Sequence, residues 1–410
     1  MKNISQDDNL KIIFNAQSLL PPLTGIGFYT KHLIEEISQQ PHVECLAGFL
    51  GRQLFDANEL IIFCEKQEIR LSVGSANYIN LHKKSASLKN LIKRLTRSVP
   101  GTYALRHYLR EYVGGRKLSK LGSKGFIYHE PNYVPVSYPG RMVITVHDLS
   151  HIRYPQFHPP ERVSFLNRHL PAALQRADRV LTDSHFVAQE IMDVFGTPAG
   201  KIAVTHLGAD VASRSRSEEE EAATLQQFKL RQSGFVLSVA TLEPRKNLER
   251  LIDGYAALPD ALRRDYPLVL VGGGGWKNTS LLSRFEELEA RGEAIRTGYL
   301  PRNQVLDLYA SAALFAYPSL YEGFGLPVLE AFASGVPVLT SNISSLPEIS
   351  GGAALEVDPL SVGAIAEGLR ALLDDTALRR RHASLGIERA KAFSWKHCAE
   401  QTLAVYRQLA

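Results

Sequence analysis

Cysteine is scarce in this sequence, and the few cysteines present form no cluster. The 410 residues include three of them, Cys45, Cys64 and Cys398. An odd, scattered set predicts neither a disulfide framework nor a metal-ligand cluster, and it fits a reducing cytoplasm. No apolar run approaches the roughly 20 residues of a membrane-spanning helix. The N-terminal stretch begins polar and passes directly into a strand pattern, so we expect a cytoplasmic protein without a cleaved signal.

Motifs of several other functions are missing as well. No two aspartates stand two positions apart, so the sequence lacks the D-x-D pair that often holds a divalent cation for nucleotide sugars. The dinucleotide fingerprint G-x-G-x-x-G begins at Gly25 and Gly27 but has Thr30 at its last position, which disfavours a dehydrogenase. "VGGGGW", with Gly272 to Gly275, favours a tight loop over a dinucleotide cradle. No nucleic-acid-binding module is recognisable, so no nucleic-acid partner is expected.

Positive charge is concentrated in one segment. The net charge is +5, yet residues 83–124 hold twelve Lys or Arg and one acid, Glu111, a sum of +11 that leaves −6 for the rest. From Leu88 to Arg97, apolar residues recur at helical spacing with cations between them. The pattern predicts an amphipathic helix that binds an anionic membrane surface. A solvated face on a helical pair of the first domain explains the same pattern, and the sequence leaves both interpretations open.

Short β-rich runs alternate with helical patterns along both halves of the chain. Examples are "MVITVHD" in the first half and "LVLVGG" in the second. Continuous apolar strands separated by helices predict parallel sheets covered on both faces, and a chain of this length exceeds one core. We therefore predict an α/β protein with two doubly wound, Rossmann-like domains, 1–212 and 232–393, that face each other across a cleft. Residues 213–231 are interpreted as a linker, and a helix at 394–410 is expected to pack back on the first domain.

The stretch "SLYEGFGLPVLEAFASGVPVLTSN", residues 319–342, combines a glycine-rich turn with two carboxylates. Pro327 suits a first helical turn and Gly335 suits the residue after a helix end, so we predict a helix from Pro327 to Ser334. The glycines before it let backbone N–H groups approach an anion. Because carboxylates grip sugar hydroxyls, a phosphate joined to sugars suits both features. An ordinary strand, turn and helix with two solvated glutamates is the structural alternative.

Two cations follow the first strand of the second domain, in "LEPRKNL". Arg245 offers a planar fork of donors and Lys246 a compact charge, which together suit a diphosphate leaving group. Two cations near the positive start of a helix are unfavourable without an anion, which favours phosphate binding over a solvated helix start. In the first domain, Gly25 and Gly27 lie between a strand and a helix, so their backbone can approach a phosphate too. A tight strand-to-helix turn is the ordinary explanation of these glycines.

Five stretches, taken in order, resemble the retaining glycosyltransferases of family 4, a GT-B group. "EGFGLPVLE" resembles the E-x7-E signature, "PPLTGIGFYT" the N-terminal glycine loop, "VHDLSHIRYP" the histidine loop, "LEPRKNL" the basic pair and "GYLPRNQVLDLYASAALFAYPS" the lead-in to the signature. The resemblance implies transfer of a hexose, such as mannose from GDP-mannose, onto a lipid-linked or polysaccharide acceptor in bacterial lipopolysaccharide or O-antigen synthesis. It also implies a front-face displacement with retention. Because the sequence has no D-x-D pair, we expect no metal, and no other cofactor is expected.

The resemblance further implies roles for individual residues of the donor site. Glu330, in the first turn of the predicted helix, takes the ribose hydroxyls, and Glu322 lies on the sugar side. The backbone of Phe324, Gly325 and Leu326 follows the donor towards its phosphate, and Tyr299 and Leu300 flank the base. Many relatives carry an arginine several residues before Lys246, where this chain has Ala240 and Thr241, so Arg245 is expected to take that role. The candidate catalytic residues are His147, Glu322, Arg245 and Lys246.

On the first domain, His147 and Asp148 end the strong strand "MVITV", at the edge of the sheet where ligands bind. By resemblance, His147 holds a sugar hydroxyl or faces the reacting centre, and Asp148 orients its loop. His129, Glu130 and Asn132 are candidates for the acceptor side.

Two other functions remain open at this point. A nucleotide-sugar epimerase shares the two-domain plan and needs no acceptor. A non-catalytic nucleotide-sugar-binding protein would not need the candidate catalytic residues, and slow donor hydrolysis would reject it.

Overall fold

The computed structural model describes residues 9–20, 23–50, 53–66, 115, 118–209, 218–273 and 279–410. Most of the basic segment 83–124, and with it the predicted membrane-binding helix, lies outside these ranges. The chain divides into two compact units. Unit 1 comprises Met1–Asp183, Val187–Thr205 and Trp395–Ala410, and unit 2 comprises Ser184–Phe186 and His206–Ser394.

Unit 1 is built on a seven-stranded sheet of order β3-β2-β1-β4-β5-β6-β7. Neighbouring strands are parallel except for β3, which pairs antiparallel with β2. The strands are β1 (Leu10–Asn15), β2 (Val43–Leu50), β3 (Gln53–Asp56), β4 (Ile127–Glu130), β5 (Met142–Thr145), β6 (Arg179–Thr182) and β7 (Ile202–Val204). The helices include α1 (Gly25–Ser38), α4 (Ser150–Arg153), α5 (Pro160–Arg176) and α6 (His185–Phe195), whose first two residues belong to unit 2.

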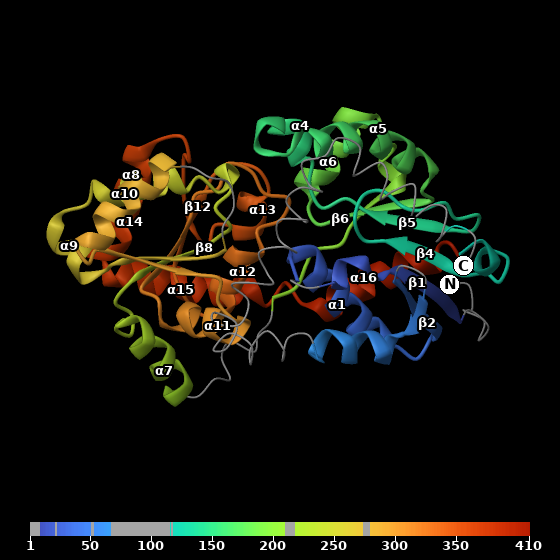
Figure 1. The fold of residues 1–410 in the computed structure, drawn as a ribbon, viewed down its shortest axis with the longest axis horizontal. Coiled ribbons are helices and arrows are strands. Elements are labelled where there is room, and N and C mark those ends of the chain that lie inside the picture. Colours follow the sequence, from blue (N-terminus) through green and yellow to red (C-terminus); the bar gives the residue numbers. More distant parts are fainter. Residues whose placement is uncertain are drawn as a thin grey trace, which may run out of the picture. The chain divides into compact units, whose positions relative to one another are not determined.

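The last helix, α16 (Trp395–Arg407), belongs to unit 1 although it follows unit 2 in the sequence. It packs along α1, and Figure 1 shows the red α16 beside the blue α1. The ring of Trp395 stacks on that of His32 in α1, with centroids 4.7 Å apart. The Tyr406 hydroxyl lies 2.5 Å from Nδ1 of His129 in β4. Both ends of the chain thus contribute to one core.

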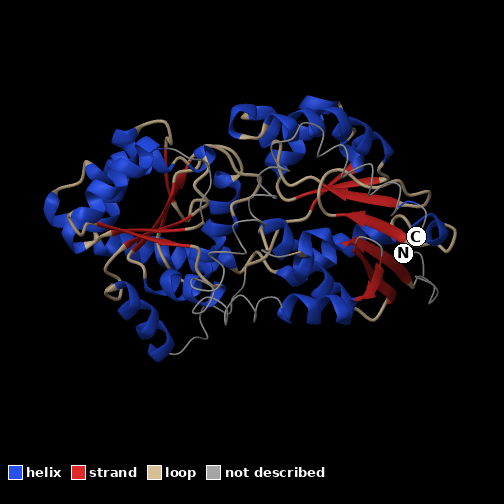
Figure 2. Cartoon of the chain, in the orientation of Figure 1, coloured by secondary structure: helices blue, strands red, loops and turns tan. Residues whose placement is uncertain are grey.

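Unit 2 is built on a six-stranded parallel sheet of order β10-β9-β8-β11-β12-β13. Figure 2 shows each sheet in red, with the blue helices packed around it. The strands are β8 (Val236–Val239), β9 (Leu268–Val271), β10 (Ala294–Gly298), β11 (Leu314–Tyr317), β12 (Val338–Ser341) and β13 (Leu355–Val357). The helices are α7 (Glu218–Phe228), α8 (Leu248–Ala256), α9 (Asp260–Asp265), α10 (Thr279–Ala290), α11 (Arg302–Ser311), α12 (Leu326–Ala333), α13 (Leu346–Ser350), α14 (Val362–Asp374) and α15 (Thr376–Ala390).

Several strands are buried at every position because the sheets are covered on both faces. All four residues of β5, β9, β11 and β12 are buried, as expected of parallel strands between layers of helices. The prediction of two doubly wound units rested on these runs. The shorter or more polar strands β3, β10 and β13 were not predicted, since "QLFD", "AIRTG" and "LEV" carry no continuous apolar signal. None of the helices in the described ranges is long and apolar enough to cross a membrane.

The helix predicted at residues 327–334 is α12, Leu326–Ala333. Its N-cap is Gly325, with φ of 112°, and Gly335 follows the C-cap with φ of 77°. Both values are typical of glycine, because a Cβ penalises left-handed backbone. One detail of the prediction was wrong: Glu330 is the fifth residue of α12 and lies beyond its first turn.

Candidate active site

The basic pair lies on a short turn between β8 and α8. Arg245 and Lys246 belong to the 3-10 turn η5 (Pro244–Lys246). The Arg245 carbonyl accepts hydrogen bonds from the Leu320 N–H, at 2.9 Å, and from the Ser319 hydroxyl, at 3.0 Å. The backbone that carries the two cations is therefore tied to the segment before the E-x7-E signature, 74 residues further along the chain.

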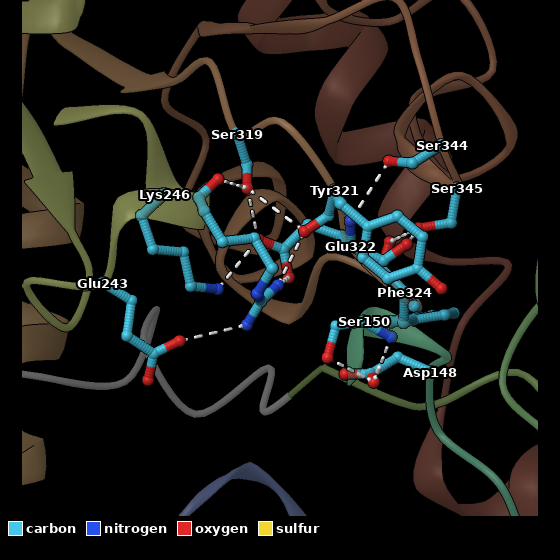
Figure 3. A network of polar contacts seen from close by, with 12 residues as sticks. Asp148, Ser150, Glu243, Lys246, Ser319, Tyr321, Glu322, Phe324, Ser344 and Ser345 are labelled. Atoms are coloured by element: carbon cyan, nitrogen blue, oxygen red, sulfur yellow. Dashed lines mark hydrogen bonds and ion pairs between the residues drawn. The ribbon is translucent and has the colours of Figure 1, made fainter. Parts of the chain in front are cut away.

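The carboxylate of Glu322 is the common partner of several polar groups in this region, as Figure 3 shows. Its Oε1 accepts from Nζ of Lys246 at 2.8 Å, and Oε2 accepts from Nη1 of Arg245 at 3.0 Å. The hydroxyls of Tyr317 and Ser319 also donate to Oε1, at 2.9 and 2.6 Å. Glu322 therefore forms ion pairs with both Arg245 and Lys246. Contact of its carboxylate with a donor sugar stays a prediction.

The charges in this network set each other's protonation. Burial raises the pKa of Glu322, but Arg245 and Lys246 outweigh burial and hold that pKa at about 2. Burial and Arg245 lower the pKa of Lys246 more than Glu322 raises it. Glu243 is a second, weaker partner of Arg245, at 3.4 Å. The cations are thus held in place by carboxylates, which is the arrangement that a preorganised anion site needs.

The glycine-rich turn of the signature is fixed by serine hydroxyls. Ser345 donates to the carbonyls of Glu322, at 2.9 Å, and Phe324, at 2.8 Å, and Ser184 donates to the Gly323 carbonyl at 2.7 Å. In a trans peptide the N–H points opposite to the C=O. The three N–H groups that follow these carbonyls therefore point away from the serines that bind them. Such a turn can present backbone donors to a phosphate in front of α12.

The remaining donor-site candidates of unit 2 lie near the start of α11, in α12 and in the turn before α12. Glu330 forms an ion pair with Arg302 in which Nη2 and Oε1 are 2.7 Å apart. Tyr299 is 62% exposed and Leu300 is buried. Phe324 is also buried, against Phe393 and His206. Leu300 and Phe324 can therefore offer a ligand their backbone rather than their side chains.

In unit 1, both ring nitrogens of His147 make hydrogen bonds. Nδ1 lies 2.7 Å from the carboxylate of Asp183 and Nε2 lies 2.9 Å from the Pro131 carbonyl. Both partners only accept, so both nitrogens must donate and the ring is an imidazolium. Burial lowers the pKa of His147, but Asp183 and the two hydrogen bonds raise it above its ordinary value. Contact with a donor sugar, which would have to replace the Pro131 carbonyl, stays a prediction.

The charge of His147 makes a pH dependence testable. Because the folded pKa of His147 is raised, its pair with Asp183 stabilises the fold fully below the unfolded pKa of about 6.5, and this stability is lost as pH rises through the folded pKa. We expect Asp183→Asn to lower the free energy of unfolding by about 3 kcal/mol at pH 6, and by less at higher pH. Urea unfolding of both proteins at several pH values measures the difference. A difference that grows with pH would contradict the imidazolium.

The other unit 1 candidates fall into two groups. Asp148 accepts through Oδ1 from the Tyr133 hydroxyl, the Ser150 N–H and the Ser150 hydroxyl, at 3.0, 3.0 and 2.8 Å, as an orienting role requires. His129 and Glu130, predicted on the acceptor side, are instead core residues with 0% and 2% exposure. Their burial inside unit 1 contradicts contact with an acceptor.

The reason is local packing around β4. His129 lies between the hydroxyls of Tyr406 and Thr145, and burial lowers its pKa to about 3, so the ring is neutral. Glu130 accepts from Asn15, at 2.5 Å, and from the Tyr128 hydroxyl, at 2.9 Å. Asn132, two residues after β4, is exposed, and its acceptor role stays a prediction.

The glycines noted in the sequence differ in how closely neighbouring atoms would approach a side chain at each position. Gly25 and Gly27 are the first and third residues of α1. A Cβ on Gly27 would lie 2.7 Å from the Ser18 carbonyl oxygen, whereas one on Gly25 would meet nothing within 4 Å. A Cβ on Gly272 would lie 1.9 Å from the Ala240 carbonyl oxygen, so this glycine lets β8 and β9 approach at their ends. Gly27 and Gly272 therefore have packing reasons, and phosphate contact by Gly25 and Gly27 stays a prediction.

One group in the described residues has a metal-ligating composition. Ligand atoms of His185, His206 and Glu348 lie within 4.8 Å of one another. The Glu348 carboxylate accepts from the N–H groups of His185 and Phe186, at 2.9 and 3.1 Å, and lies 2.8 Å from Nε2 of His206. These bonds cap the start of α6, whose positive end would repel a cation. We assign the group to capping.

Sequence reasoning missed four residues that hold the candidate site. Tyr317 and Ser319 hydrogen-bond to Glu322 from the end of β11, just before the signature. Polar residues at the end of a parallel strand indicate a ligand site, so the sequence could have identified these two. Asp183 ends β6 beside His147 at the end of β5, and β5 pairs with β6, so the same rule applies. Nothing in the sequence indicated a role for Arg302, since its position is that of a solvated residue at the start of a helix.

Comparisons with known proteins identify the family and the fold of this chain. Residues 25–213 match the family described as Glycosyltransferase Family 4, and residues 222–389 match Glycosyl transferases group 1. The chain is 35% identical over 400 residues, 98% of its length, to all of the O-antigen chain mannosyltransferase B of Escherichia coli. The glycosyltransferase WaaG, involved in lipopolysaccharide biosynthesis, superposes with a TM-score of 0.64 at 16% identity, covering 96% of this chain and 99% of its own. Anabaena Alr3699/HepE in complex with UDP and glucose superposes with a TM-score of 0.66 at 17% identity, covering 98% of this chain and 100% of its own.

Two doubly wound units with these structural relatives define a GT-B fold, as predicted. The chain belongs to glycosyltransferase family 4, and it is a retaining glycosyltransferase.

Proposed function

We propose that the protein transfers mannose from GDP-mannose to a lipid-linked saccharide during synthesis of an O-antigen chain. The observation that carries this proposal is the 35% identity with the O-antigen chain mannosyltransferase B of Escherichia coli, which extends over 98% of the chain. The site supports it, because Arg245 and Lys246 are preorganised cations suited to a diphosphate. Cytoplasmic location is part of the proposal.

The proposed reaction proceeds by front-face displacement. The bond between the mannose C1 and the diphosphate oxygen breaks, and a bond from C1 to the acceptor oxygen forms on the same face. The acceptor hydroxyl proton passes to the departing phosphate oxygen, so no protein base is needed. Arg245, Lys246 and the N–H groups of the glycine-rich turn stabilise the charge that develops on the diphosphate. We propose that the reaction needs no metal, because the sequence has no D-x-D pair.

The proposal also assigns roles to the other residues. Glu322 holds the two cations, and its contact with the donor sugar is part of the proposal. Glu330 binds the ribose hydroxyls, and Tyr299 flanks the base. His147, as an imidazolium, supplies positive charge on unit 1. We further propose that the basic segment 83–124 contacts an anionic membrane that carries the acceptor, a proposal that rests on its sum of +11.

One assay tests the function. The purified protein is incubated with labelled GDP-mannose or a uridine diphosphate sugar and a lipid-linked saccharide, with and without EDTA. We expect transfer from GDP-mannose with an unchanged anomeric configuration and the same rate in EDTA. In a thermal-shift series with guanosine, uridine and adenosine diphosphates, the preferred nucleotide at 100 times its dissociation constant should add about 2.7 kcal/mol of stability.

Other outcomes would contradict the proposal in separable ways. Epimerised donor in the absence of an acceptor would indicate the epimerase. Nucleotide binding with neither transfer nor hydrolysis would indicate a non-catalytic protein. Activity that EDTA abolishes and magnesium or manganese restores would contradict metal independence alone.

A further inference from the structure

An arginine outside the predicted site holds one of the signature carboxylates. Arg302 is the first residue of α11, and its Nη2 lies 2.7 Å from Oε1 of Glu330 in α12. The side chains are 33% and 16% exposed, so the pair is partly shielded from water. α11 and α12 are neighbours within unit 2. This ion pair therefore fixes a carboxylate of the donor site from a neighbouring helix.

The position of Arg302 is unfavourable on local grounds alone. A cation in the first turn of a helix faces the positive end of the helix dipole. The N-cap, Pro301, makes no side-chain capping bond that would offset this charge. A partly buried carboxylate is likewise unfavourable without a partner. Arg302 and Glu330 each offset the other, which explains why the two charges are kept together.

Arg302 also lies close along the chain to the residue expected beside the base. Tyr299 precedes it by three residues and is 62% exposed, one of few large apolar side chains so exposed in the described residues. An exposed aromatic ring is a surface on which a base can stack. Along the chain, Arg302 thus follows the residue expected beside the base, and in space it contacts the residue expected on the ribose. This is where a residue that orders the nucleoside end of the site would lie.

We propose that Arg302 is a positioning residue for Glu330 and thereby determines how strongly the enzyme recognises the vicinal ribose hydroxyls of its donor nucleotide. This inference rests on the proposed function. Two hydroxyls on adjacent carbons are bound well by one carboxylate only when its plane is fixed, because both hydrogen bonds are directional. The guanidinium on Oε1 fixes that plane. Without it, Glu330 can turn between rotamers and binds a diol less well.

The experiment compares GDP with 2′,3′-dideoxy-GDP by titration calorimetry, with UDP and 2′,3′-dideoxy-UDP as a second pair. The readout is the ratio of the two affinities, which reports recognition of the hydroxyls separately from the phosphates. For the wild type we expect a preference of at least about tenfold for the ribonucleotide. Glu330→Ala should bring the ratio near one. Arg302→Ala should bring it within about twofold of the Glu330→Ala value, and Arg302→Lys should restore part of it.

The control is Arg370→Ala, which removes an exposed arginine paired with Asp374 on α14 and should keep the wild-type ratio. A wild-type ratio in Arg302→Ala would overturn the inference, whatever happens to overall affinity. A wild type that does not prefer the ribonucleotide, or a Glu330→Ala variant that still does, would also overturn it. Transfer from GDP-mannose, measured on the same proteins, separates these failures from a failure of the proposed function.

Discussion

Replacing Lys246 by alanine is expected to lower turnover by about 100- to 1,000-fold at saturating donor, because one charged stabiliser of the departing diphosphate is lost. Nζ of Lys246 is held by Glu322 at 2.8 Å and by the Tyr317 hydroxyl at 2.6 Å, so the charge is in place before the donor binds. Initial rates at saturating GDP-mannose measure the effect. Arg245→Ala should be similar or milder.

Two comparisons make this prediction specific. Lys391→Ala removes an exposed lysine that pairs with Glu388 at 2.6 Å, and its turnover should match the wild type. The melting temperature of Lys246→Ala shows whether lost activity reflects lost fold. Unchanged turnover in both Lys246→Ala and Arg245→Ala would remove the assignment of these cations to the diphosphate.

Glu322→Gln is expected to lower the free energy of unfolding by about 3 kcal/mol at neutral pH, because two largely shielded cations lose their common counter-charge. Both cations are only 12% exposed at the side chain, so water cannot replace the carboxylate. The variant should also lose turnover more than donor affinity, since misplaced cations stabilise the departing charge poorly. Urea unfolding and donor titration measure the two effects.

The pH dependence of this difference has a definite sign. The pKa of Glu322 is about 2 in the folded protein, against 4.5 for the free side chain. Its stabilisation is therefore fully present above the unfolded pKa and is lost as pH falls through the folded pKa. The wild type should keep its advantage over Glu322→Gln down to about pH 4.5 and lose it towards pH 2. An advantage that persists at pH 2 would show that the ion pairs do not carry it.

The fold could be predicted wherever local sequence and burial agree. Strands such as β9 and β11 are hydrophobic and buried at every position, and Pro327 and Gly335 mark the two ends of α12 well. Strands such as β13, three residues at the edge of its sheet, are defined by pairing with a neighbour rather than by their own residues. No local pattern contains that information.

The site could be predicted in part for the same reason. Arg245, Lys246 and Glu322 stand in recognisable motifs, and the structure brings all three together. His129 shows the limit, because a strand-end position does not say whether a side chain faces solvent or a helix that arrives 277 residues later. Asp183 and Arg302 show another limit, since each is defined by a partner on a different element.

The return of α16 to unit 1 has a consequence for biosynthesis. A ribosome makes the strands of unit 1 early, but the Tyr406 hydroxyl that lies against His129 is made 277 residues after that histidine. Nearly all of unit 2 is one continuous stretch, His206–Ser394, and is complete before α16 emerges. During synthesis, the first half of the chain must therefore wait with the site for α16 uncovered while the second half folds.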